Sequence, residues 1–466
     1  MRICRSSSSS SWSSCSSGRA HSRRDARYRV VRRYVAPLLL LLLASCRRSE
    51  APGTAPDALP PLTLDAAPAT PPADAADAPA AAAAQEEEAP GDPREELTSR
   101  TYDVLLEGST VYRGTTAGVV IEDVTEPEKP KRLGVAFLPG SVNDLEWIGK
   151  FERAVATACP SLPDGGSGCP APPPMLLLVA AAGPEGVFLI DVTDPAQPRQ
   201  VSRFDTAGAA MHVAVAFPLL FVADGTNGVV AIDAADPEHP ALAGAWNGDW
   251  PAAMNLARPC ALLPADGGGR CAPAAPEPTE SVYARDVELV SGRLWVAAGA
   301  AGVVAVDIGN WQRVAGPLAL SPRLVVDTPG DARAVAVDGN RLYVADGPGG
   351  FHIVDLGLGD PQGRASILAT YPTGDICRDV KINMAQDKSL FPPAAYLAVG
   401  DRGLEIVDIA HGDTPMKLGA HVPQRPVNRV TVGPNGLLLL ANDAAGLMIV
   451  DAADPGAIRQ IFPAAR

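Results

Sequence analysis

Short apolar runs separated by turn residues recur along most of the chain, and one unit shows the pattern best. Residues 333–337, 342–345, 351–356 and 365–371 are rich in Val, Ile, Leu and Tyr, and Gly, Asn, Asp and Pro lie between them. Runs of this length with such boundaries are typical of β-strands joined by tight turns. The chain lacks the apolar spacing of amphipathic helices. The pattern therefore predicts an all-β fold with four strands in each unit.

The unit occurs seven times. Each copy begins with Gly and has Asp five residues later, and the copies lie at residues 118–123, 186–191, 228–233, 302–307, 350–355, 403–408 and 446–451. The shortest spacing is about 42 residues, which fits four short strands per repeat. Sheets that are apolar on both faces must pack against a neighbour on each side, as the blades of a propeller do. We therefore predict a seven-bladed β-propeller over residues 100–466, behind an unstructured N-terminal tether.

The best copies read GFHIVD (350–355), GLEIVD (403–408) and GLMIVD (446–451). Strands that end in IVD after a turn of the type AD-G-x-x-G resemble the LVIVD-repeat family of exported or surface propellers. The resemblance covers residues 100–460, and these last three copies are the closest to the family pattern. It implies the fold and export, and it implies no particular reaction.

The two ends of the repeat region indicate how the ring closes. Residues 102–106 have the character of a first strand, and residues 458–462 have that of a fourth. No strand is left over to complete a blade at the other end of the chain. We expect closure by packing between the first and last blades.

The N-terminus resembles the export signal of a bacterial lipoprotein. Arg32 and Arg33 precede a short apolar stretch, and residues 43–46 read LASC, which resembles a lipobox. That stretch is too short to span a bilayer, so residues 1–45 are predicted to be a signal peptide. The resemblance implies that Cys46 is acylated and becomes the mature N-terminus. The alternative is a chance match to the short motif.

The residue after the lipobox and the segment before the signal refine this prediction. Arg47, rather than Asp, follows the cysteine, which by family analogy favours the outer membrane or cell surface. Residues 1–29 are rich in Ser and Arg and are unusual for a leader. We therefore expect translation to begin after them.

Composition separates a tether from the propeller. Residues 46–99 are mostly Ala, Pro, Asp and Glu, so they cannot bury a core and are predicted to be a disordered linker. Nine Arg and one Asp lie in residues 1–45, which leaves 30 basic and 52 acidic residues, a net charge of −22. Such a chain repels phosphate backbones, so nucleic acid is excluded as a partner. We expect a monomer.

The cysteines of the mature chain fall into pairs. Cys159 and Cys169 lie in one Pro- and Gly-rich insertion, and Cys260 and Cys271 lie in a second. In an oxidising compartment each pair is predicted to form a local disulfide. A metal site is the alternative, although neither pair has CxxC spacing or a nearby His. Cys377 is left over and is predicted to be a buried free thiol.

The repeated Gly and Asp residues are interpreted as structural. A Gly in every blade fits a turn that requires positive φ. An Asp in every blade fits an acceptor for backbone N–H groups of the next turn. Catalysis is the less favoured alternative for these residues, which are Asp123, Asp191, Asp233, Asp307, Asp355, Asp408 and Asp451.

The start of each first strand should line the mouth of the central channel. The charged residues there form a ring that either binds a small anion or metal ion or joins the blades by ion pairs and hydrogen bonds. We favour the structural alternative because repeated residues usually have repeated structural roles. Residues that break the pattern, His212 and Arg429 among them, are the better functional candidates. The ring comprises Asp103, Asp144, His212, Arg285, Asp286, Arg333, Arg378, Asp379 and Arg429.

One insertion on the same face offers a second candidate surface. It begins with Trp246 and Trp250 and contains the second cysteine pair. The two Trp side chains either shield the end of the propeller or anchor a protein or sugar partner. The other insertion, residues 152–174, is expected on the opposite face.

The sequence carries no HExxH, GxSxG, Walker or Rossmann motif, and no cofactor is predicted. We therefore expect a lipid-anchored, extracytoplasmic propeller that acts as a binding or scaffold module for an envelope protein or carbohydrate. An alternative is a hydrolase or lyase with its site at the channel mouth. A structural coat component is a third hypothesis.

Overall fold

The computed structural model describes residues 100–152, 173–248, 282–309, 317–357, 365–383 and 393–463. The chain divides into two units, residues 1–84 and 85–466, and every described residue belongs to the second. The predicted signal peptide, the predicted lipidation site Cys46 and the predicted linker of residues 46–99 all lie outside the described residues. No helix in the described ranges is long and apolar enough to cross a membrane.

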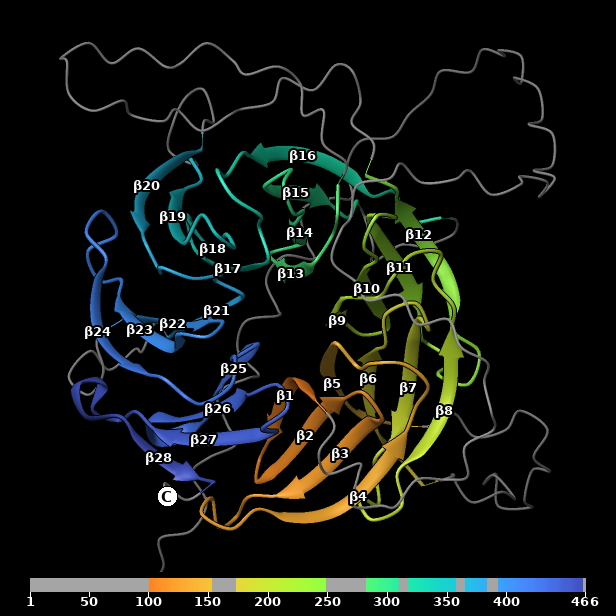
Figure 1. The fold of residues 1–466 in the computed structure, drawn as a ribbon. Helices are drawn as coiled ribbons and strands as arrows, with labels where there is room; N and C mark the ends of the chain where they lie inside the picture. The colour runs from red at the N-terminus through yellow and green to blue at the C-terminus, as the bar shows by residue number, and fades with distance from the viewer. Residues whose placement is uncertain are drawn as a thin grey trace, which may run out of the picture. The chain divides into compact units, whose positions relative to one another are not determined.

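The described residues form seven four-stranded antiparallel sheets arranged as the blades of a ring (Figure 1). The first strands, which lie nearest the centre, are β1 (Thr101–Glu107), β5 (Asp144–Phe151), β9 (His212–Ala216), β13 (Asp286–Val290), β17 (Ala334–Asp338), β21 (Asp379–Asn383) and β25 (Arg429–Val432). The second strands are β2 (Thr110–Thr115), β6 (Met175–Ala181), β10 (Leu219–Ala223), β14 (Arg293–Ala297), β18 (Arg341–Ala345), β22 (Ala394–Val399) and β26 (Leu437–Ala441). This arrangement confirms the predicted seven-bladed propeller.

The remaining strands lie toward the outside of each blade. The third strands, which carry the repeat motif, are β3 (Gly118–Asp123), β7 (Val187–Asp191), β11 (Val229–Asp233), β15 (Val303–Asp307), β19 (Phe351–Asp355), β23 (Gly403–Asp408) and β27 (Leu447–Asp451). The fourth strands are β4 (Lys131–Phe137), β8 (Arg199–Phe204), β12 (Ala241–Trp246), β16 (Ser321–Val326), β20 (Ser366–Tyr371), β24 (Met416–His421) and β28 (Arg459–Phe462). Two short 3-10 turns, η2 (Pro434–Gly436) and η3 (Pro455–Ala457), are the helical elements of the described ranges.

The core lies between the blades. Second and third strands are buried on both faces, and apolar clusters join successive sheets, as where Ile121 of the first blade packs with Leu178 of the second. Burial on both faces is the reason the strands are apolar throughout. A β-bulge also recurs at one position in every blade, where the fourth strand has one extra residue opposite the third. Such a bulge increases the local twist.

The repeated Gly and Asp have the structural roles predicted for them. Gly228 shows the turn requirement: its φ is +74°, and a Cβ there would lie 2.1 Å from the Trp246 carbonyl oxygen. The repeat Asp accepts a hydrogen bond from the N–H two residues later in six blades. Asp307 is the exception, because its carboxylate pairs with Arg293 and Arg323.

The ring closes without a borrowed strand, as the two ends of the repeat region predicted. Every sheet is built from consecutive strands, and β1 contacts both β25 and β26. The Thr101 N–H donates to the Asp443 carbonyl at 2.9 Å, and Asn428 Nδ2 donates to the Thr101 carbonyl at 3.2 Å. Val104 packs in the same apolar cluster as Leu439. The last blade is therefore joined to the first by backbone bonds and core packing.

Candidate functional site

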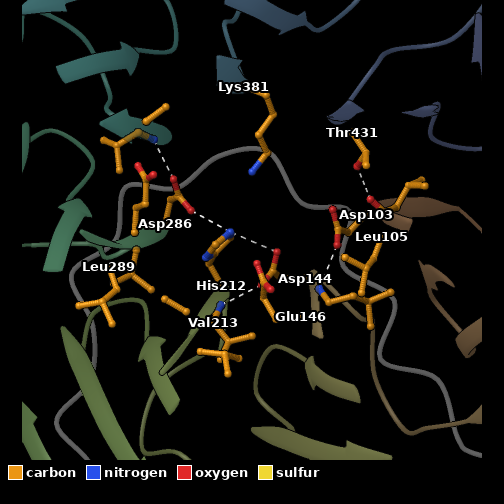
Figure 2. Close-up of a pocket in the computed structure, with 18 of the residues that line it drawn as sticks. Asp103, Leu105, Asp144, Glu146, His212, Val213, Asp286, Leu289, Lys381 and Thr431 are labelled. Carbon is orange, nitrogen blue, oxygen red and sulfur yellow. Dashed lines mark hydrogen bonds and ion pairs between the residues drawn. The ribbon is translucent and has the colours of Figure 1, made fainter. Parts of the chain in front are cut away.

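The first strands enclose a central cavity of about 530 Å³ (Figure 2). Each first strand contacts the first strands of the adjacent blades, so polar side chains from six of the seven blades converge on one space. The wall otherwise consists of aliphatic side chains such as Leu289 and Val213. The polar lining residues are Asp103, Asp144, Glu146, His212, Asp286, Glu288, Lys381 and Thr431.

Four aspartates at the start of first strands join neighbouring blades. Each carboxylate accepts a hydrogen bond from a backbone N–H in the first strand of the next blade, at 2.7 to 2.9 Å. The pairs are Asp103 with Leu145, Asp144 with Val213, Asp286 with Val335, and Asp379 with Val430. A buried carboxylate with such donors fixes the spacing of adjacent strands. This geometry favours the structural interpretation of these four residues, and we call them the aspartate staples.

His212 and Arg429 occupy the same position in blades that lack a staple. His212 Nε2 lies 2.9 Å from Asp286 Oδ1 and 3.2 Å from Asp144 Oδ1, as Figure 2 shows. Arg429 lies 3.6 Å from Asp379 and 4.0 Å from Asp144. The two basic residues therefore offset the charge of three staples rather than project free into the cavity.

The electrostatics of this pair network follow from burial and proximity. Burial lowers the pKa of His212, but the charges of Asp144 and Asp286 outweigh it and raise that pKa to about 9. Burial would raise the pKa of Asp286, yet the His212 charge and hydrogen bond hold it well below the usual range. His212 is therefore a charged imidazolium at neutral pH.

A second group of charged residues lies two positions further along three of the first strands. Glu146, Glu288 and Lys381 follow Asp144, Asp286 and Asp379, and strand geometry places residues i and i+2 on one side. We call Glu146, Glu288 and Lys381 the second tier. Sequence reasoning missed it, although charged residues in otherwise apolar inner strands were a usable signal.

The carboxyl groups that lack a cationic partner resist ionisation. Burial and the nearby Asp286 charge raise the pKa of Glu288 to about 7, and one of its oxygens has no hydrogen-bond partner. Burial and Asp144 raise the pKa of Asp103 to about 7. The pKa of Glu146 is raised for the same two reasons. At neutral pH the cavity therefore holds both ionised and protonated carboxyl groups.

Lys381 differs from the other charged residues of the cavity. Its ammonium group projects into the central space (Figure 2), and within the described ranges it makes no hydrogen bond or ion pair. Its side chain is exposed to the cavity. Burial lowers the pKa of Lys381, but the charges of Asp379 and Asp286 raise it above the ordinary value. The group is therefore charged and open to a ligand.

The expected single ring of charged residues is divided into two parts. Arg285, Arg333 and Arg378 immediately precede the first strands but do not line the cavity. They lie at the rim of the ring. There, the turn between the second and third strands of one blade pairs with the residues just before the first strand of the next blade. The backbone bridge between Gly347 and Cys377 is an example. Asp331 pairs with Arg285 at 3.1 Å and with Arg333 at 2.8 Å.

The other predicted sites are described only in part. Trp246 ends β12 and is buried in the core, which agrees with the packing alternative for this residue. Trp250, the two cysteine pairs (Cys159 with Cys169, and Cys260 with Cys271) and Cys46 lie outside the described residues. Cys377 is a buried free thiol, as predicted, and burial raises its pKa well above the ordinary value. In the described part of the chain no cluster of His, Cys, Asp and Glu is arranged to hold a metal ion.

The repeats match a known family model. Residues 207–247, 329–359 and 394–413 match the LVIVD repeat. The chain carries LVIVD repeats. The matched stretches lie in the third, fifth and sixth blades. The copy at residues 446–451 lies outside the matched stretches.

Two solved structures are similar to this chain. A protein from Bacteroides uniformis, named as a candidate 6-phosphogluconolactonase, is 12% identical over 75% of this chain and 92% of its own, with a TM-score of 0.51. The computationally designed Ika8 protein is 11% identical over 78% of this chain and 87% of its own, with a TM-score of 0.46. At 12% identity, the likeness to the Bacteroides uniformis protein concerns the fold alone. The comparison with curated proteins gave no match.

Proposed function

We propose that the protein is an exported, lipid-anchored propeller that acts as a binding module for a carbohydrate of the cell envelope. The LVIVD repeats and the propeller fold support a binding or scaffold role. The lipobox-like residues 43–46 and the acidic tether support anchoring with the propeller held away from the membrane. The proposed ligand site is the central cavity.

The observation that carries the proposal is the free ammonium group of Lys381. The ammonium group is exposed and, among the described residues, unpaired, so it is available to a ligand, and the nearby aspartates are already held in staples. A carboxylate of the ligand would pair with Lys381. Its hydroxyl groups would donate to Glu146 and Glu288, whose protonated forms also supply donors. A sugar acid, such as the end of an acidic glycan, combines these groups.

Calorimetric titration of the full-length protein tests this assignment. Glucuronate and glucose serve as probes because they differ in the carboxylate. We expect saturable binding of glucuronate, about tenfold or more weaker binding of glucose, and loss of glucuronate binding in Lys381→Met. The matched control is Lys131→Met, an exposed lysine at the start of β4. Binding that persists in Lys381→Met, or no binding of glucuronate, would contradict the proposal.

A hydrolase or lyase remains the second candidate because Asp103 and Glu288 have pKa values of about 7. A carboxyl group that titrates near neutral pH suits general acid or base catalysis. An acidic oligosaccharide incubated with the protein distinguishes the two functions. A binding module leaves the length of the oligosaccharide unchanged. An enzyme shortens the oligosaccharide, and the rate of shortening falls in Glu288→Gln.

A further inference from the structure

Three arginines form a second cluster at the rim, separate from the central cavity. Arg285, Arg333 and Arg378 precede the first strands β13, β17 and β21, which belong to three successive blades (Figure 1). None of the three lines the cavity that contains Lys381. Their clustering contrasts with the net negative charge of the chain.

The arginines are close enough to influence one another. Asp331 bridges two of them, with one oxygen 3.1 Å from Arg285 Nε and the other 2.8 Å from Arg333 Nη2. Burial together with the positive charges of Arg285 and Arg378 lowers the pKa of Arg333, against the opposing effect of Asp331. The cluster therefore concentrates positive charge that one carboxylate does not balance.

Two of the guanidinium groups have unused donors. The Nε atoms of Arg333 and Arg378 are buried and have no hydrogen-bond acceptor. Arg378 also makes no ion pair within the described ranges, although its side chain is partly exposed. Burying an N–H group without an acceptor costs free energy, so an acceptor is expected to occupy this place.

Glycines of the adjacent turns make room for these side chains. A Cβ at Gly347 would lie 3.2 Å from Arg333 Nε, and a Cβ at Gly400 would lie 3.5 Å from Arg378 Nε. Both glycines have positive φ, at +55° and +42°. The turns therefore hold each guanidinium against the backbone, which limits the conformations that binding must fix.

A second carboxylate close to the arginines does not satisfy the cluster. Asp375 lies beside the Gly400 turn, but its two oxygens accept hydrogen bonds from the Ile376 and Asp401 N–H groups at 2.7 and 2.8 Å. Even with Asp375 counted beside Asp331, three arginines leave an excess of one positive charge. An added anion would restore the balance.

We propose that Arg285, Arg333 and Arg378 form a binding site for the phosphate group of a small phosphomonoester. Planar guanidinium groups bind such oxyanions through paired hydrogen bonds. A phosphate presents more oxygens than a carboxylate, so it can receive donors from three arginines on different blades. The site is independent of the proposed carbohydrate site in the cavity.

Calorimetric titration of the full-length protein with inorganic phosphate and glycerol 3-phosphate tests this proposal. We expect one saturable site for each probe. Arg378→Gln should weaken binding by about tenfold or more, because it removes charge-assisted hydrogen bonds but breaks no ion pair described here. Arg378→Lys should bind with intermediate affinity. The control Arg459→Gln, in the outer strand β28, should bind as the wild type does.

A second variant keeps the test independent of any folding defect in the first. Asp331→Asn removes the carboxylate that pairs with Arg285 and Arg333, so it should bind phosphate more tightly, by about threefold or more. Absence of a saturable site, or affinities in Arg378→Gln and Asp331→Asn within about twofold of the wild type, would overturn the proposal. Binding only to phosphatidylglycerol vesicles and not to either soluble probe would also overturn it.

Discussion

The two tiers of charge in the central cavity differ in what satisfies them. The aspartate staples are buried, accept backbone N–H groups of the next blade, and in three cases pair with His212 or Arg429. The second tier of Glu146, Glu288 and Lys381 lies two residues further on and has no ion pair within the described ranges. Charged residues on the same strands can therefore hold the ring together or remain available to a ligand.

The largest expected effect is on a staple. Asp144→Ala removes the acceptor for the Val213 N–H and leaves His212 and Arg429 with fewer partners. Breaking a buried ionic network of this kind should lower the free energy of unfolding by about 4 kcal/mol. Urea denaturation of the full-length protein measures it. Asp338→Ala, at the exposed end of β17, is the control. Equal midpoints for the two variants would contradict the structural role of the staples.

The next effect concerns the pH dependence of stability. His212 has an ordinary pKa of 6.5 and a folded-state pKa of about 9. The contribution of His212 to the free energy of unfolding is therefore fully present below about pH 6.5 and is lost as the pH rises through about 9. The full contribution is about 3 kcal/mol. In His212→Gln the urea midpoint of unfolding should depend less on pH over this interval than it does in the wild type. A wild-type stability that rises from about pH 6.5 to about pH 9 would contradict the network.

The smallest effect concerns the second tier, where the substitution is expected to stabilise the protein. Glu288 has an ordinary pKa of 4.5 and a folded-state pKa of about 7, so it lowers stability as the pH rises through that range. Because Glu288 is only partly buried, solvent screening reduces this effect, so Glu288→Gln should raise the free energy of unfolding by about 1 kcal/mol at about pH 8 and leave it unchanged at about pH 4. Glu107→Gln, at the exposed end of β1, is the control. Destabilisation of Glu288→Gln at about pH 8 would place Glu288 among the staples.

The fold could be predicted from sequence because each blade repeats its own local signals. Two signals recur at a fixed spacing in the copies. One is a Gly at a turn that requires positive φ, such as Gly228, and the other is an Asp that caps the next turn, so the seven copies reinforce one another. The recurring bulge was not predictable from that pattern, because the extra residue lies in the fourth strands, which vary most in sequence.

The site was only partly predictable because its contacts join residues far apart in the chain. The first residues of the inner strands were recognised from their alignment, and the staples among them have the structural role that was favoured. The pairing of His212 with both Asp144 and Asp286 depends on the curvature of the ring, which no local pattern encodes. Glu288 and Lys381 were missed because they do not recur in every blade.

The measurement that tests the distinction between the tiers most directly combines stability and binding in Asp144→Ala and Lys381→Met. For each variant, the unfolding midpoint and the affinity for glucuronate are measured on the same preparation. We predict that Asp144→Ala loses stability and keeps its affinity within about threefold, whereas Lys381→Met keeps its midpoint and loses binding. If both variants lose stability and binding together, the two tiers are one structural network and the central claim is wrong.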